Sequence, residues 1–128
     1  MKLYCCGCGQ DVDARLTDGS EIYPHRTSLG ELPFWRCDAC GGFVGCHYKT
    51  KDRTRPLGCI PTAEIREARK YIHILLDSLW IDGNMNRKSV YAHLTKVLGR
   101  EYHTADLRDL DEARRIYRAC QTLAMDRR

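Results

Sequence analysis

The sequence lacks the features of a membrane protein or of an exported protein. No stretch approaches the 18 or so consecutive apolar residues of a membrane-spanning helix, so we expect no membrane partner. The first residues, Met-Lys-Leu-Tyr-Cys-Cys, have no apolar run behind the lysine, so we also expect no signal peptide. Both observations favour a cytoplasmic location.

Large apolar residues are scarce as well. Leu, Ile, Val and Phe make up only about a fifth of the 128 residues, near the lower limit for a self-sufficient globular protein. A strong charge of one sign is also missing, because 21 basic and 17 acidic residues leave a net charge of +4. This mild excess is compatible with a nucleic-acid partner without requiring one. A chain so poor in core residues gains from a bound metal that cross-links it.

Cysteine, in contrast, is abundant, and four of the eight cysteines form two identical units. The pattern Cys-x-x-Cys-Gly occurs at residues 5–9 and again at 37–41. Two thiolates at this spacing share one tight turn, and two such turns complete the closed shell of four sulfurs that structural Zn²⁺ prefers. Without an export signal, metal is favoured over disulfides. The sequence predicts one structural zinc ion with four ligands: Cys5, Cys8, Cys37 and Cys40.

Four further residues are spare candidate ligands: Cys6, Cys46, His47 and Cys59. Cys6 is an alternative to Cys5 in the first half-site, but the spacing from Cys5 to Cys8 gives the better geometry. Cys46 and His47 are neighbours on a predicted strand and point to opposite faces, which argues against a shared metal. Buried cysteines at 46 and 59 are favoured over a second zinc site.

The first half of the chain has the composition of a small sheet. Apolar residues between the two Cys-x-x-Cys units indicate short strands: Val12, Leu16, Ile22 and Tyr23. A turn composition at 17–20 interrupts them, and extended segments lie at 32–36 and 41–48. The expected apolar cover of the sheet is Phe34, Trp35, Phe43 and Val44. We predict a zinc-ribbon module over residues 1–60, with about three antiparallel strands.

The second half, residues 61–128, predicts a helical module. Apolar residues recur at three- and four-residue steps in three segments: Thr62 to about Trp80, Arg87 to Leu98, and from Asp109 or Asp111 onward. Asn86 is suited to cap the second helix and Gly99 to end it. The predicted fold class is therefore α+β, a zinc ribbon packed with a three-helix unit.

A basic segment at 47–55 is the strongest nucleic-acid signal in the chain. If the segment is extended, it presents four basic side chains to one side: Lys49, Lys51, Arg53 and Arg55. Such a row neutralises phosphates, and Tyr48, with Trp35 near it, offers an aromatic ring on which a base can stack. The segment equally fits a solvated loop with no partner. DNA and RNA are both candidates.

Polar side chains form a row on the first predicted helix: Arg66, Lys70, His73 and Asp77. Together with His47, the residues Arg66, His73 and Asp77 are the natural cluster for an enzyme. More often such a row is a solvated helix face with pairs four residues apart. A catalytic zinc needs an open coordination position, which four cysteines close. Catalysis is therefore not expected.

Several motifs follow one another in a recognisable order: Cys-Gly-Cys-Gly at 6–9, Trp-Arg-Cys-Asp-Ala-Cys-Gly-Gly-Phe-Val-Gly-Cys-His at 35–47, Pro-Leu-Gly at 56–58, Glu-Ile-Arg-Glu-Ala-Arg-Lys-Tyr-Ile-His at 64–73 and Asp-Ser-Leu-Trp at 77–80. In this combination the chain resembles the zinc-finger-containing domain family of unknown function found in bacteriophages and prophages. It departs from the family at Cys6, where proline is usual, and at Cys46, where a small hydroxyl or aliphatic residue is usual. The resemblance implies a zinc ribbon and a phage or prophage origin, hence a bacterial host cell. It implies no activity.

Three functions follow from these observations. The leading one is a small zinc-binding accessory protein of phage type that binds nucleic acid through the ribbon and the 47–55 loop. The alternative is a protein–protein adaptor or an inhibitor of a host factor, in which the zinc is purely structural. The third is an enzyme that uses the polar cluster.

Overall fold

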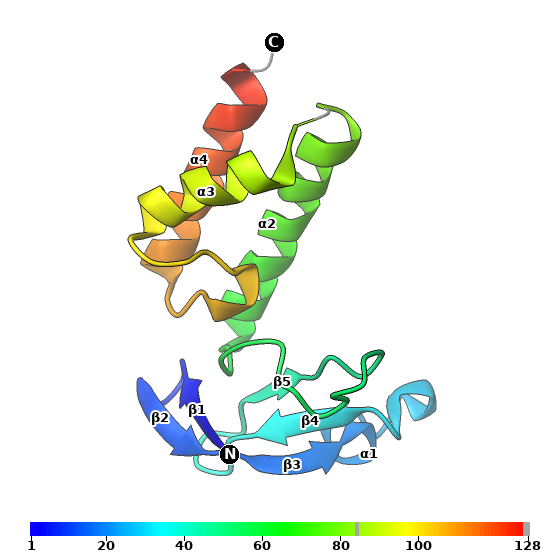
Figure 1. Ribbon diagram of the computed structural model, residues 1–128. Helices are drawn as coiled ribbons and strands as arrows, with labels where there is room; N and C mark the ends of the chain where they lie inside the picture. Colours follow the sequence, from blue (N-terminus) through cyan, green and yellow to red (C-terminus); the bar gives the residue numbers. More distant parts are fainter. Residues whose placement is uncertain (84, 127–128) are drawn as a thin grey trace. The chain divides into compact units, whose positions relative to one another are not determined.

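The computed structural model describes residues 1–83 and 85–126, and the chain forms two compact units, Met1–Ala63 and Glu64–Arg128. Strands and short helical segments build the first unit: β1 (Lys2–Cys5), β2 (Gln10–Asp13), β3 (Arg15–Asp18), α1 (Gly19–Ile22), η1 (Thr27–Leu29), β4 (Pro33–Arg36) and β5 (Phe43–Gly45) (Figure 1). Helices follow: α2 (Ala63–Ile81), α3 (Arg87–Leu98), η2 (Thr104–Asp106) and α4 (Leu110–Asp126). The predicted α+β fold class is confirmed. None of the described helices is long and apolar enough to cross a membrane.

Two small antiparallel sheets carry the first unit. Strands β1 and β2 pair with Leu3 opposite Val12, and the second sheet has the order β3-β4-β5 with Trp35 opposite Val44. The chain after β5 returns to β1, where the amide N–H of Ile60 donates to the carbonyl of Tyr4 at 2.9 Å. Ile60 is completely buried, so the end of the ribbon segment is part of its core.

The prediction of strand at Ile22 and Tyr23 is wrong, because the chain turns into α1 at that point. The Asp18 side chain accepts a hydrogen bond from the amide of Ser20 and caps this helical turn. Glycine at position 19 lets the turn form, since a Cβ there would lie 1.7 Å from a backbone oxygen of the following loop. A side-chain cap and one close backbone approach thus outweigh the strand propensity of the apolar residues.

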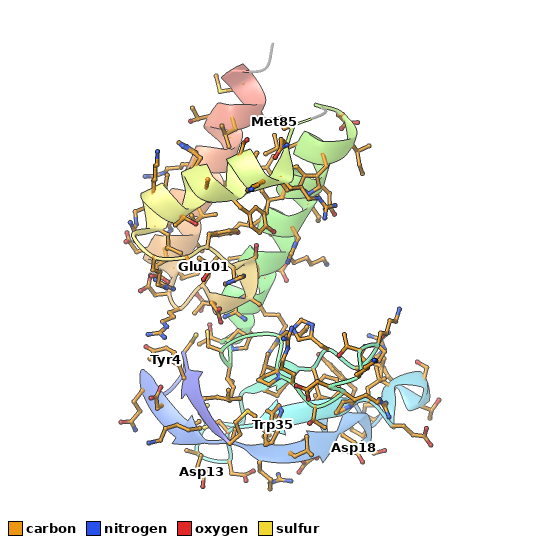
Figure 2. All side chains as sticks on the ribbon, viewed as in Figure 1. Tyr4, Asp13, Asp18, Trp35, Met85 and Glu101 are labelled. Atoms are coloured by element: carbon orange, nitrogen blue, oxygen red, sulfur yellow. The ribbon has the colours of Figure 1, made fainter. Side chains whose placement is uncertain are left out.

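The faces of the β3-β4-β5 sheet cover two different clusters. On one face Trp35, which is labelled in Figure 2, and Val44 pack in the core that contains Cys5, Cys37 and Ile60. On the other face, three aromatic rings meet edge to face with centroids 5.5–6.0 Å apart: Tyr23, Phe34 and Phe43. Phe34 and Val44 are buried and Trp35 and Phe43 are half-buried, in agreement with the predicted apolar cover.

The helical boundaries follow their capping residues closely. The Asn86 side chain accepts from the amide of Ser89 at 3.1 Å and opens α3, and Gly99 ends that helix at a φ of +86°. The Asp109 side chain accepts from the amide of Glu112 at 2.8 Å and opens α4 in the same way. The predicted bounds of α3 are confirmed.

The core of the second unit includes residues that the sequence pattern did not identify. Leu76 and Leu79 of α2 are buried, as their helical spacing predicted. Arg69 is buried as well, because its guanidinium donates to the carbonyl of Leu107 at 2.7 Å. Tyr102 lies in the segment predicted as a connector, yet it is buried and its hydroxyl is 2.6 Å from that of Thr104. Burial raises the pKa of Tyr102.

A partly buried ion pair fixes the start of α4. The guanidinium of Arg100 forms a bidentate contact with the carboxylate of Glu112 and also donates to the carbonyl of Asp106 at 2.9 Å. The same carboxylate accepts from the amide of Arg108 at 2.9 Å. The Arg100 guanidinium holds the pKa of Glu112 below its ordinary value.

Replacing Leu76 by alanine should destabilise the helical unit by about 2–5 kcal/mol, because it opens a cavity at a fully buried site. Ile74→Ala is the matched control on the same helix, since Ile74 is exposed, and it should change the free energy of unfolding by less than about 0.5 kcal/mol. Chemical denaturation followed by circular dichroism measures both. Equal effects would mean that the buried face of α2 is assigned incorrectly.

Glu112→Gln should lower stability by about 1–3 kcal/mol at neutral pH, because it removes a charge-assisted contact from a largely buried carboxylate. The folded pKa is lowered, so this contribution is present above the ordinary carboxyl pKa and is lost as the pH falls through the folded value. The difference between variant and wild type should therefore shrink in acid. Asp111→Asn, one residue earlier and exposed, is the control and should have little effect at any pH. A pH-independent loss in Glu112→Gln would contradict the ion-pair account.

Candidate metal centre

The two Cys-x-x-Cys-Gly units fold into the same turn. In the first, the amide of Gly9 donates to the carbonyl of Cys5 at 2.8 Å, and in the second the amide of Gly41 donates to the carbonyl of Cys37 at 2.7 Å. Both glycines have a positive φ, +69° and +80°, which other residues adopt at a cost. The glycine in each motif is thus required by the turn that presents the two sulfurs.

The four sulfurs lie close enough to bind one ion. The Sγ atoms of Cys5, Cys8, Cys37 and Cys40 are all within 4.8 Å of one another. The pairs between the two turns measure 3.5 Å from Cys5 to Cys40 and 3.7 Å from Cys8 to Cys37. A tetrahedron with Zn–S bonds of about 2.3 Å has edges of about 3.8 Å. The cluster therefore fits one structural zinc ion, as predicted.

The site joins the two sheets of the first unit. Cys5 is the last residue of β1, and Cys37 directly follows β4. Both are buried, whereas Cys8 is half-buried and Cys40 is exposed. The ion would thus be held between two sheets that share few apolar residues, with one side of the site near solvent.

Two further glycines make room for the sulfur of Cys40, and sequence reasoning missed them. A Cβ on Gly7 or on Gly42 would lie 3.3 Å from that sulfur. The amide of Gly42 also lies 3.4 Å from the sulfur as a donor, and its Cβ position is 3.0 Å from Ile60. The signal was present in the sequence as a second glycine in each unit, at Cys6-Gly7-Cys8 and at Gly41-Gly42.

The four thiols contact one another in pairs across the cluster, Cys5 with Cys40 and Cys8 with Cys37. Burial raises the pKa of Cys5, and a hydrogen bond to Cys37 raises the pKa of Cys8 to about 12. Burial acts against ionisation of Cys37 too, but the amides of Cys40 and Ala39 outweigh it and lower its pKa. Zinc binds thiolates, so binding releases protons and zinc affinity falls as the pH falls.

The remaining candidate ligands lie outside this cluster. Cys6 is not part of it, and its sulfur lies 3.8 Å from that of Cys59. Cys46 and Cys59 are both buried, which agrees with their interpretation as small core residues. Cys46 pairs with Pro56 in an isolated bridge, and burial raises the pKa of its thiol.

An exposed ion network braces the second turn. The guanidinium of Arg15 contacts both oxygens of Asp38, the residue after Cys37, at 2.8 and 2.9 Å, and also contacts Glu21 at 3.0 Å. Arg36 adds longer contacts to the same two carboxylates. Arg15 lowers the pKa of Asp38 and of Glu21. The network ties β3 to the turn, and its exposure limits its contribution to stability.

The 47–55 segment is not the extended strand on which its predicted alternation depended. The amide of Thr50 donates to His47 at 3.1 Å and that of Arg55 donates to Asp52 at 3.1 Å, so the segment folds into two turns. The amide of His47 donates to the carbonyl of Arg55 at 2.9 Å and closes the loop. Hydrogen bonds within the loop replace the pairing with a neighbouring strand that an extended conformation needs.

The predicted contact residues are nevertheless all on the surface of this loop. Exposed side chains are Tyr48, Lys49, Lys51, Arg53 and Arg55. Trp35 has a different position, because its indole N–H donates to the carbonyl of Thr54 at 2.6 Å while its ring packs against the core. Trp35 therefore anchors the loop through its indole N–H, and with its ring half-buried it offers less surface for stacking than Tyr48 does.

The proposed polar cluster is divided between the two units. His47 is half-buried in the first unit, and Arg66, His73 and Asp77 lie on α2. His73 and Asp77 are exposed and Arg66 is half-buried. A catalytic role for these residues remains a prediction.

Serine at position 5 should abolish stoichiometric zinc binding and unfold the first unit, because Cys5 supplies one of the four sulfurs. Serine at position 6 is the matched control, since Cys6 is the neighbouring cysteine outside the cluster, and this variant should retain one zinc ion per chain. Metal analysis of the purified proteins measures the stoichiometry, and circular dichroism follows the fold. If Cys5→Ser kept one zinc ion per chain and Cys6→Ser lost it, Cys6 and not Cys5 would be the zinc ligand.

The sequence was compared with protein-family models, with curated proteins and with solved structures. Residues 1–124 match the model of a family described as a zinc-finger-containing domain. No curated protein and no solved structure matched. The family match spans both units, and its description agrees with the four-sulfur site. The chain therefore belongs to the zinc-finger-containing domain family.

Proposed function

We propose that this protein binds nucleic acid through the loop at residues 47–55 of the zinc-binding unit. The observation that carries the proposal is the concentration of exposed positive charge on one closed loop. Four basic side chains project from it, Lys49, Lys51, Arg53 and Arg55, with a single acid, Asp52, among them. Among the described residues, none of the four basic side chains is in an ion pair. They are available to phosphates.

The loop is held in place at several points, which favours binding without a large cost of ordering. Its ends are joined by the hydrogen bond between His47 and Arg55, and the indole of Trp35 donates to Thr54, the residue before Arg55. The Arg53 side chain also donates to the carbonyl of Tyr48 at 3.3 Å. Such preorganisation leaves more of the contact energy as affinity.

Tyr48 gives the loop a means of contacting bases as well as phosphates. Its ring is exposed, and the Lys49 ammonium lies 5.8 Å from the ring centroid. An exposed ring beside a cation suits the stacking of an unpaired base next to its phosphate. This arrangement favours single-stranded DNA or RNA over a duplex, whose bases are stacked on one another.

In this proposal the zinc ion is structural. It holds the scaffold from which the loop projects, and the four cysteines leave no open position for a substrate. The family resemblance supports an accessory role in a phage or prophage, and therefore in the cytoplasm of a bacterial host cell.

Replacing all four basic residues of the loop by serine should reduce the slope of log affinity for single strands against log salt by roughly three units. The slope should change in the same way for every sequence tested, because these four side chains contact phosphates, whereas Tyr48, which is unchanged, contacts bases. Fluorescence anisotropy with random single-stranded DNA and RNA between low and moderate salt gives the slopes. The zinc content should be unchanged, since none of the four residues contributes to the metal site.

Two double variants test whether binding depends on the positive charges of the loop or only on the total charge of the protein. Lys49→Ser with Lys51→Ser should lower the slope by about half as much as the fourfold variant, roughly 1.4 units, whereas Lys88→Ser with Lys96→Ser on α3 should leave it nearly unchanged. Both pairs remove two exposed positive charges. Equal effects would indicate non-specific attraction, and no binding at low salt by the wild-type protein would end the nucleic-acid proposal.

A further inference from the structure

A separate hollow lies in the helical unit, between α2 and α4. Its volume is about 540 Å³, and it is open to solvent along one side. Ala68 and Ile72 contribute from α2, and Leu110 and Ala113 from α4. The two alanines explain the hollow, because larger side chains at these positions would fill the space between the helices. We call this hollow the α2/α4 groove.

Large aromatic side chains flank the α2/α4 groove and remain accessible. Tyr71 is 54% exposed and Tyr117 is 37% exposed. One turn beyond Tyr71, Ile74 is 57% exposed and extends the apolar surface along α2. Tyrosine is among the residues that contribute most to protein–protein affinity, and an apolar groove between two helices accommodates a third helix.

The charge at the edge of the groove is positive and uncompensated. Arg114 and Arg118, one helical turn apart on α4, both line it, and no acidic residue does. In the part of the chain that the structure describes, neither arginine is in an ion pair, whereas their neighbour Arg115 pairs with Asp111 at 3.3 Å. A ligand that fits this edge carries two negative groups about 6 Å apart, the separation of residues four apart on a helix.

We propose that the α2/α4 groove docks an amphipathic helix of a partner protein, with apolar side chains over Ala68 and Ala113 and carboxylates at Arg114 and Arg118. The lining favours this occupant over a nucleic acid. Its inner surface is mostly Ala, Ile and Leu, Gln121 is the one amide side chain among the lining residues that can read a base edge, and two cations compensate only a short stretch of phosphates. The inference is independent of the proposed nucleic-acid loop, which lies in the other unit.

A displayed library of helical peptides tests the chemistry of this groove on the full-length, zinc-loaded protein. The library varies apolar positions at i, i+4 and i+7 and leaves the flanking positions free to be acidic, basic or neutral. Selected binders should be enriched in Glu and Asp four residues apart. In an NMR spectrum of the isotope-labelled protein, addition of a selected peptide should shift the signals of Tyr71, Tyr117 and Ala68.

Charge reversal gives the decisive variant. Arg114→Glu with Arg118→Glu should weaken a selected peptide by about tenfold or more, and a peptide with Lys in place of its acids should regain affinity for that variant. Arg115→Glu, on the same helix but outside the groove, is the matched control and should change affinity little. Thermal unfolding of each variant verifies that α4 is intact.

Four results would each overturn the proposal. They are the absence of any groove-dependent binder, selected binders without enrichment in acids, an oligo(dT) strand that shifts the same tyrosine signals, and concentration-dependent self-association abolished by the charge reversal. The third would assign the groove to nucleic acid and the fourth to a second copy of this chain.

Discussion

Coordination of one metal ion by four cysteines is the constraint on which the zinc-binding unit depends. The two sheets of this unit are short, and the apolar residues between them are few, so burial of apolar surface alone gives little stabilisation. The four-sulfur cluster links the end of β1 to the turn after β4, two points separated by some thirty residues in sequence. A metal bond across such a long loop compensates for a small core, in the way a disulfide does in a secreted domain. This explains why small glycines surround Cys40, where any side chain would move a sulfur.

Features encoded in a few neighbouring residues could be read from the sequence. The two Cys-x-x-Cys-Gly turns fix their own geometry, and the spacing alone distinguished Cys5 from Cys6. Asn86 and Gly99 likewise fixed both ends of α3, because a cap and a left-handed residue act within one turn of helix. In each case the local structure is determined by interactions between residues that lie within about four positions of one another in the sequence.

Features that depend on distant partners could not be read in this way. Arg69 has the charge of a surface residue, but its guanidinium donates to the carbonyl of Leu107 and is buried. The loop at 47–55 looked extended because its charges alternate, yet its conformation is set by the bond between its ends and by Trp35. The turn at Gly19 depends on a backbone carbonyl of a later loop. A local pattern carries no information about such partners.

The basic side chains of this protein fall into two groups: those that pair with carboxylates and stabilise the fold, and those without a carboxylate partner among the described residues. Arg15 and Arg100 make bidentate contacts with carboxylates and brace, respectively, the second cysteine turn and the start of α4. The basic side chains of the 47–55 loop and of the α2/α4 groove have no such partner among the described residues. A solvated cation without an ion-pair partner costs little free energy, so its exposure alone does not indicate a binding site. In both places, however, the unpaired cations stand beside an accessible tyrosine on a surface whose backbone is fixed, by hydrogen bonds in the loop and by helix packing at the groove. Cations beside aromatic rings suit the binding of an anionic partner, and this combination is the physical basis of both proposals.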